Sequence, residues 1–107
     1  MGSYTHDCVL AIGFGDEWVA SVEEFRMGLP AEYIRILSNP IVGMNGQVSY
    51  LFGPDGGKDG GERSQQMDKR RELFIALVEE QGKGFAQYIH LRFGETVEGV
   101  EISSTNV

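Results

Sequence analysis

The chain has 107 residues, 41% of them hydrophobic, and a formal net charge of −7. This length predicts one domain, residues 1–107, with enough apolar side chains for a core of its own. The negative charge argues against binding to the phosphate backbone of nucleic acid, and no apolar run reaches the roughly 18 residues that cross a bilayer. We therefore expect a cytoplasmic protein with no nucleic-acid or membrane partner, and loose ends at residues 1–5 and 103–107.

A strand followed by two helices is predicted for the first third of the chain. Side chains alternate with a period of two over residues 6–14. Asp16 is placed to cap a helix by accepting bonds from its free N–H groups, and Pro30 permits a second, short helix. One side of the strand carries Cys8, Leu10, Ile12 and Phe14, and the other carries Asp7, Val9, Ala11 and Gly13.

The dipeptide Asn45-Gly46 is the clearest turn signal in the sequence. It lies between residues 41–44 and 47–52, and it supplies the positive φ angles of a two-residue type I′ hairpin. Residues 53–61 follow and are rich in glycine, which predicts a loop rather than a regular element. The register of the hairpin places on one face Ile41, Val48, Tyr50 and Phe52.

A helix and a strand with apolar faces follow this loop. The helix is expected over residues 64–81, with Ser64 as its cap, Gly82 as its stop, and the buried stripe Met67, Leu73, Phe74, Leu77 and Val78. The strand is expected over residues 85–93, and its helix-facing side carries Ile89, Leu91 and Phe93. A short edge strand is expected over residues 97–102.

The order of these elements predicts an α+β fold. Strand, helix pair, two strands, helix and strand give the βαββαβ order of a ferredoxin-like plait, with an extra C-terminal edge strand. Both helices are then expected on one face of an antiparallel sheet. This likeness is one of architecture, so it implies no residue roles.

The other face of such a sheet is open to a partner. The predicted face assignments place there Val9, Ala11, Leu51, Tyr88, His90 and Arg92. This set is too apolar to be only solvated, and apolar surface on a small domain commonly marks an interface. The leading hypothesis is a small acidic, non-enzymatic binding or regulatory module whose open sheet face contacts a protein partner or a second copy of the chain.

Two other functions are compatible with the sequence. Two plaits can join their sheets into a dimeric barrel that binds or transforms a small molecule, with Tyr88 and His90 lining the space between them. An acidic inhibitor of viral or mobile-element type could instead imitate nucleic acid. That function requires the carboxylates between Asp16 and Glu32 to form a stripe at phosphate-like spacing.

The spacing of polar residues does not support a metal or cofactor site. Asp55, Asp59 and Glu62 lack the alternate-residue spacing of a calcium-binding helix-loop-helix motif. Two histidines and one cysteine, Cys8, do not supply enough ligands for zinc, and Cys8 is expected to be a small buried side chain. We expect no cofactor and no catalytic residue.

Lys69–Arg71 is the only basic run in the chain. On a helix these three residues spread over more than half of the circumference, so they do not form a flat patch. Asp68 and Glu72 flank them, and ion pairs at three- and four-residue spacing are the expected arrangement.

Overall fold

One antiparallel sheet with two α-helices packed on it makes up the fold in residues 4–57, 60–82, 84–95 and 97–107, which the computed structural model describes. The strands are β1 (Thr5–Phe14), β2 (Ile41–Val42), β3 (Gln47–Phe52), β4 (Ala86–Gly94) and β5 (Val100–Thr105). The helices are α1 (Asp16–Met27) and α2 (Glu62–Gln81). Two 3-10 helices, η1 (Ala31–Ile36) and η2 (Met44–Gly46), come between α1 and α2 in the chain.

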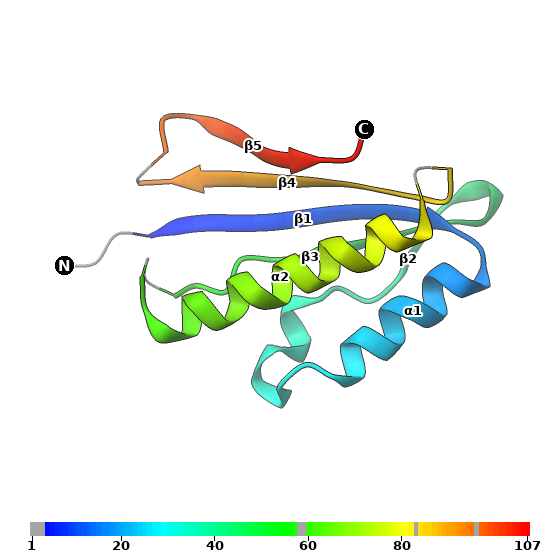
Figure 1. Cartoon of the computed structure of the whole chain (residues 1–107), viewed down its shortest axis with the longest axis horizontal. Helices are drawn as coiled ribbons and strands as arrows, with labels where there is room; N and C mark the ends of the chain where they lie inside the picture. Colours follow the sequence, from blue (N-terminus) through cyan, green and yellow to red (C-terminus); the bar gives the residue numbers. More distant parts are fainter. Residues whose placement is uncertain (1–3, 58–59, 83, 96) are drawn as a thin grey trace.

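The strand order in the sheet is β2-β3-β1-β4-β5, and every neighbouring pair is antiparallel. The α+β class is therefore confirmed, and β5 is the expected additional edge strand beside β4. The assignment to the ferredoxin-like plait stays a prediction. Both helices lie on the same side of the sheet: α2 packs on β4 and β1, α1 packs on β1 and on α2, and β5 is the edge strand beyond β4 (Figure 1).

The core lies between the helices and one face of the sheet. Burying each large apolar side chain there contributes about 1.5–3 kcal/mol. The helices supply Trp18, Val22, Met67, Phe74 and Val78. The sheet supplies Val9, Ala11, Val48, Tyr50 and Phe52.

Close contact between α1 and β1 explains the small residues on this face of β1. A Cβ added at Gly13 would lie 2.5 Å from Cγ of Trp18, so only glycine leaves room for the indole ring. The indole N–H of Trp18 donates a buried hydrogen bond to the carbonyl of Val48 at 2.9 Å. The predicted cap at Asp16 is wrong, because Gly15 precedes the helix and Asp16 is its first residue.

Helix α2 differs from its prediction in which residues it buries. It begins at Glu62 without a side-chain cap, so the cap predicted at Ser64 is wrong, whereas Gly82 ends it with a φ of 82° as expected. Leu73, predicted to be buried, is 55% exposed. The residues that α2 buries are Met67, Arg71, Phe74 and Val78, so an arginine lies in the apolar stripe.

The predicted hairpin forms with a loop one residue longer than expected. Asn45 and Gly46 have φ angles of 57° and 77°, as their turn chemistry requires. Strand β2 has only two residues, and Ile41 pairs with Ser49. The prediction that Ile41 shares a face with Tyr50 is wrong, because a shift of one residue moves a side chain to the other face of a sheet.

The C-terminal strand lies further along the chain than predicted. Gly99, with a φ of 78°, belongs to the turn, so β5 begins at Val100 and includes residues 103–105. These residues are therefore not a loose end. Asn106 extends the attachment to β4, because its side-chain oxygen accepts a bond from the N–H of Tyr88 at 2.8 Å. At the other end Thr5 is already part of β1, and residues 1–3 lie outside the described residues.

Candidate functional site

The sheet face predicted to be open is the face that the helices cover. Val9 and Ala11 are fully buried and Tyr88 is 6% exposed. His90 pairs with Val9 across β1 and β4, so its side chain and that of Arg92 lie on the same side as Val9. The assignment of these five residues to an open face is wrong. Both sides of β1 are apolar. The side with the smaller residues packs against the helices, because the large side chains of the helices fill the space above it.

Leu51 is the predicted site residue that does lie on the uncovered side, which we call the outer face. It pairs with Leu10, and Leu10 pairs with Ile89 on the next strand, so three apolar side chains form a row across the sheet. A parallel row consists of Cys8, Leu91 and Ile102. The apolar side chains of the outer face are Cys8, Leu10, Ile12, Leu51, Ile89, Leu91, Phe93, Val100 and Ile102.

The outer face combines these apolar side chains with a few uncharged polar ones, such as Ser49 and Gln87. Leu10 is 38% exposed, Leu51 40% and Ile102 59%. Among the described residues of β1, β3 and β4, no outward side chain belongs to Asp, Glu, Lys or Arg. Cys8 lies here half-buried, not fully buried as predicted. Burial raises the pKa of its thiol and Asp7 raises it further, while Arg71 acts in the opposite direction.

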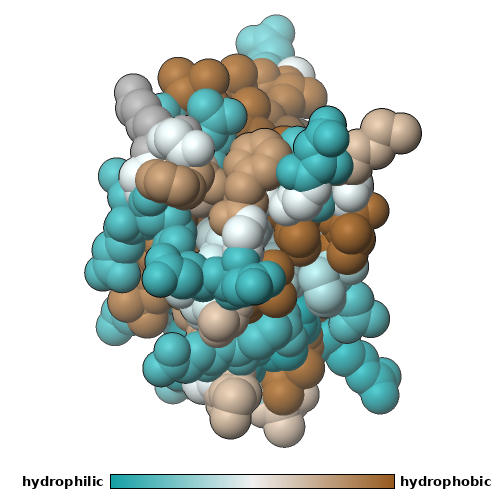
Figure 2. Space-filling view, turned by 90° about the vertical axis from the view of Figure 1, so that its right-hand side faces the viewer, coloured by the Kyte–Doolittle hydropathy of each residue, from teal (hydrophilic) through white to brown (hydrophobic). Residues whose placement is uncertain are grey.

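A depression of about 270 Å³ on the outer face includes Leu10, Ile12 and Ile89 in its lining. Hydrophobic residues also reach the surface at the end of the molecule that Figure 2 shows, at the top and on the right. Phe14 is 46% exposed and the neighbouring Phe85 is 64% exposed. Exposed apolar surface of this kind is typical of an interface.

Asp7 is the centre of a polar cluster on the helix side of the sheet. Nε2 of His90 lies 2.8 Å from Oδ1 of Asp7, and Nε of Arg92 lies 3.1 Å from the same oxygen without the alignment of a hydrogen bond. Burial alone raises the pKa of Asp7. The hydrogen bond with His90 and the charges of Arg71 and Arg92 outweigh burial, so this pKa lies below its ordinary value.

Arg71 is a second charged group on this side, only 2% exposed. Its Nη2 donates to Oδ2 of Asp55 at 2.8 Å, and its Nη1 donates to Oδ1 of Asp68 at 2.6 Å. Asp55 also accepts a bond from the N–H of Gly57 at 2.6 Å. The predicted ion pair between Arg71 and Asp68 is confirmed, but Arg71 is not a surface residue and its buried partner Asp55 was not foreseen.

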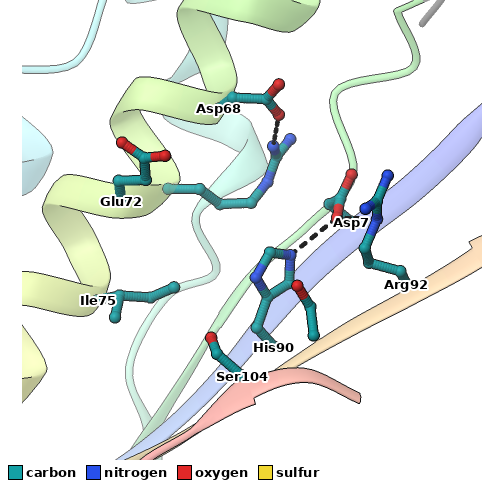
Figure 3. Close-up of a pocket in the computed structure, with 9 residues that line it drawn as sticks. Asp7, Asp68, Glu72, Ile75, His90, Arg92 and Ser104 are labelled. Carbon is teal, nitrogen blue, oxygen red and sulfur yellow. Dashed lines mark hydrogen bonds and ion pairs between the residues drawn. The ribbon is translucent and has the colours of Figure 1, made fainter. Parts of the chain in front are cut away.

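A cavity of about 420 Å³ lies between α2 and the strands β1, β4 and β5. Figure 3 shows His90 bonded to Asp7, with Ile75 pointing toward His90 from α2 and Ser104 beside it. Every lining residue except Ile75 is polar or charged: Asp7, Asp68, Arg71, Glu72, His90, Arg92, Ser103 and Ser104.

The carboxylates between Asp16 and Glu32 are partly engaged within the protein. Glu23 accepts bonds from Nε of Arg26 at 3.0 Å and from the hydroxyl of Tyr50 at 3.1 Å. Glu32 lies 3.5 Å from Arg63. These contacts remove two carboxylates from a free acidic stripe.

Within the described ranges, no group of three His, Cys, Asp or Glu side chains is placed to hold a metal ion. Of the three acidic residues that the sequence analysis weighed as calcium ligands, Asp55 is engaged by Arg71 and Asp59 lies outside the described residues. None of the described helices is long and apolar enough to cross a membrane. Comparison of the chain with models of protein families, with curated proteins and with solved structures finds no match.

Proposed function

We propose that this protein is a small non-enzymatic binding module that acts through its outer face, and that a second copy of the chain occupies that face. The observation that carries the proposal is the pair of apolar rows that cross the outer face over β3, β1, β4 and β5, with only uncharged polar side chains such as Ser49 and Gln87 beside them. Such a surface on a single layer of sheet is covered most simply by a second sheet, as in two-layer packing of sheets.

Charge favours a second copy over a different protein. The chain carries a net charge of −7, so two copies repel one another wherever their acidic surfaces meet. The outer face is the surface on which this repulsion is smallest, because the inward sides, helices and loops hold the charges. A basic partner steered by charge would instead be expected to approach an acidic surface.

A two-fold arrangement suits the rows of the outer face. In such a dimer each residue meets its own equivalent or a near neighbour, so the surface must complement itself. Leu10 lies near the middle of the face, between Leu51 and Ile89. Its side chain is therefore expected in the centre of the contact.

The rival hypothesis of a barrel that encloses a ligand between two sheets has less support. It requires Tyr88 and His90 to line the space between the sheets. Both residues lie on the helix side instead, since they share the face of Ala11 and Val9.

Size-exclusion chromatography with light scattering tests the proposal. We expect the wild-type chain to have twice its monomer mass of 11.8 kDa at micromolar concentrations. Leu10→Lys places a charge at the centre of the contact, and truncating or charging a central residue weakens association by about 2 kcal/mol or more, roughly 30-fold. Because lysine makes the chain less acidic, a loss of the dimer cannot come from greater overall repulsion.

Leu73→Lys is the matched control. Leu73 is 55% exposed on α2, away from the sheet's outer face, and the substitution changes the net charge by the same amount. We expect this variant to remain a dimer. A wild-type monomer at every concentration, or equal dissociation of the two variants, would contradict self-association through the outer face.

A further inference from the structure

We propose that the cavity between α2 and the strands β1, β4 and β5 binds a small organic cation of the polar primary amine class. The cavity measures about 420 Å³, within the range of small-molecule sites. It lies on the helix side of the sheet, so it is separate from the outer face and does not depend on self-association.

The balance of charges around the cavity indicates the sign of the ligand. The lining contains three carboxylates, those of Asp7, Asp68 and Glu72, and two guanidinium groups. Both guanidinium groups are already compensated, since Arg71 bonds to Asp55 and Asp68 and Arg92 lies 3.1 Å from Asp7. The carboxylate of Glu72 has no ion-pair partner among the described residues, so the uncompensated charge is negative.

An anionic ligand would meet three carboxylates in the same lining, those of Asp7, Asp68 and Glu72, and would be repelled by them. An ammonium group can instead approach Glu72 directly, with Asp68 one helical turn away on the same helix. The net charge of −7 also raises the local concentration of cations near the protein.

The rest of the lining favours a ligand with an oxygen atom as well as an amine. Ser103 and Ser104 supply hydroxyl groups from β5. In the tautomer whose Nε2 donates to Asp7, Nδ1 of His90 is a hydrogen-bond acceptor. Nε of Arg71 and Nε of Arg92 are buried donors without a hydrogen-bond acceptor in the described part of the chain, so an added oxygen acceptor is favourable.

The wall of the cavity is held in place before any ligand arrives. Arg71 is 2% exposed and is bonded on both sides, to Asp55 of the preceding loop and to Asp68 of α2. Asp7 and His90 fix one another across β1 and β4. Groups held in this way lose little freedom on binding, which favours a ligand of few atoms.

Titration of the isotope-labelled full chain by NMR tests the proposal with three probes of similar size. Ethanolamine carries a positive charge, ethylene glycol is neutral and glycolate is negative. We expect saturable shifts of the amides of Glu72 and Ser104 and of the His90 ring with ethanolamine. Ethylene glycol and glycolate are expected to bind at least about tenfold more weakly, because the charge-assisted bond to Glu72 is missing.

Glu72→Gln and Glu79→Gln form a matched pair of variants. Each variant replaces the carboxylate of one exposed glutamate of α2 with an amide and so removes one negative charge. Glu79, unlike Glu72, is not part of the cavity lining. Ethanolamine should bind Glu72→Gln at least about tenfold more weakly than the wild type and bind Glu79→Gln unchanged. Equal weakening of both variants would show a non-specific charge effect and overturn the proposal.

Three other results would also overturn it. They are stronger binding of glycolate than of ethanolamine, equal binding of all three probes, or no saturation with ethanolamine up to about 100 mM. Even a ligand of so few atoms should saturate the site below that concentration. Retention of ethanolamine binding in a variant that no longer forms dimers would separate this site from the proposed function.

Discussion

The buried pair of Arg71 and Asp55 leads to a specific prediction for folding stability. Asp55→Asn keeps the size of the side chain and an acceptor for the N–H of Gly57, but it removes the charge that faces Arg71. Removing one partner of a buried ion pair costs about 3–5 kcal/mol. Asp68, whose side chain is 56% exposed, remains bonded to Arg71 in this variant. We therefore expect a loss at the lower end of this range, about 3 kcal/mol.

Urea unfolding followed by tryptophan fluorescence measures this loss. Trp18 is the only tryptophan and is fully buried, so its emission reports on the core. The free energy of unfolding of a domain of this size is about 5–15 kcal/mol, and it falls by about 1–3 kcal/mol for each molar of urea. A loss of about 3 kcal/mol should therefore lower the urea concentration at the unfolding midpoint by roughly 1–3 M. Glu32→Gln is the control, since its pair with Arg63 is more than half exposed and should contribute less than about 1 kcal/mol.

The reasoning is refuted if Asp55→Asn unfolds at the same urea concentration as Glu32→Gln. A second variant separates loss of charge balance from damage to the loop. Adding Arg71→Met to Asp55→Asn removes the unpaired charge and places an apolar side chain between Met67 and Phe74 in the buried stripe. We expect the double variant to recover most of the lost stability, because apolar replacement of a buried pair is commonly neutral or stabilising.

Three further predictions concern the core and its titrating groups. Gly13→Ala should destabilise the fold by about 1–3 kcal/mol and shift the emission of Trp18 to longer wavelength, because the new Cβ forces the indole from its place. Folding lowers the pKa of Asp7, so the ionised carboxylate stabilises the folded protein above the ordinary pKa of 3.8. This stabilisation is lost as the pH falls through the pKa of the folded state. Asp7→Asn should therefore make the unfolding free energy depend less on pH in that range. Burial and Glu23 raise the pKa of Tyr50 to about 12. The neutral phenol therefore stabilises the folded protein below the ordinary pKa of 10.0, and this stabilisation should be lost as the pH rises toward 12. Tyr50→Phe should remove the latest step of the alkaline absorbance titration.

The elements of this fold were predictable from local patterns. Alternation over residues 6–14, the Asn45-Gly46 turn and the helical spacing over residues 64–81 each depend on neighbours in sequence, and each corresponds to an observed element. These signals are strong because periodicity and turn chemistry act over a few residues. They were sufficient for the α+β class.

The choice of sheet face was not predictable in the same way. Each side of β1 carries apolar residues, and hydrophobicity alone favours the side with Leu10 and Phe14 as the core. The helices reverse this choice because Trp18 needs the space over Gly13, which only the other side of the strand provides. The side of the sheet that the helices cover is therefore set by how side-chain volumes fit between elements distant in sequence. The alternation of polar and apolar residues contains no information on volume.

The polar cluster on the helix side depends on contacts between distant residues. Asp7 and His90 are 83 positions apart, and Arg71 and Asp55 are 16 apart, so neither pair forms a recognisable motif. One local signal was present. Arg71 follows Met67 by four residues and precedes Phe74 by three, which places it in the buried stripe and implies that a charged partner must be buried with it.

The sheet separates two surfaces, the outer face and the cavity under α2, and residues of both were predicted to lie together on one open face. The sheet is a single layer, so Leu10 and Leu51 on the outer face have no contact with a ligand held between α2 and the inner side of β4. A substitution such as Leu10→Lys should consequently alter association while leaving ethanolamine binding unchanged, and Glu72→Gln should do the reverse. Coupled effects would mean that the layer does not isolate the two sites, and the outer face and the cavity would then have to be treated as one functional unit.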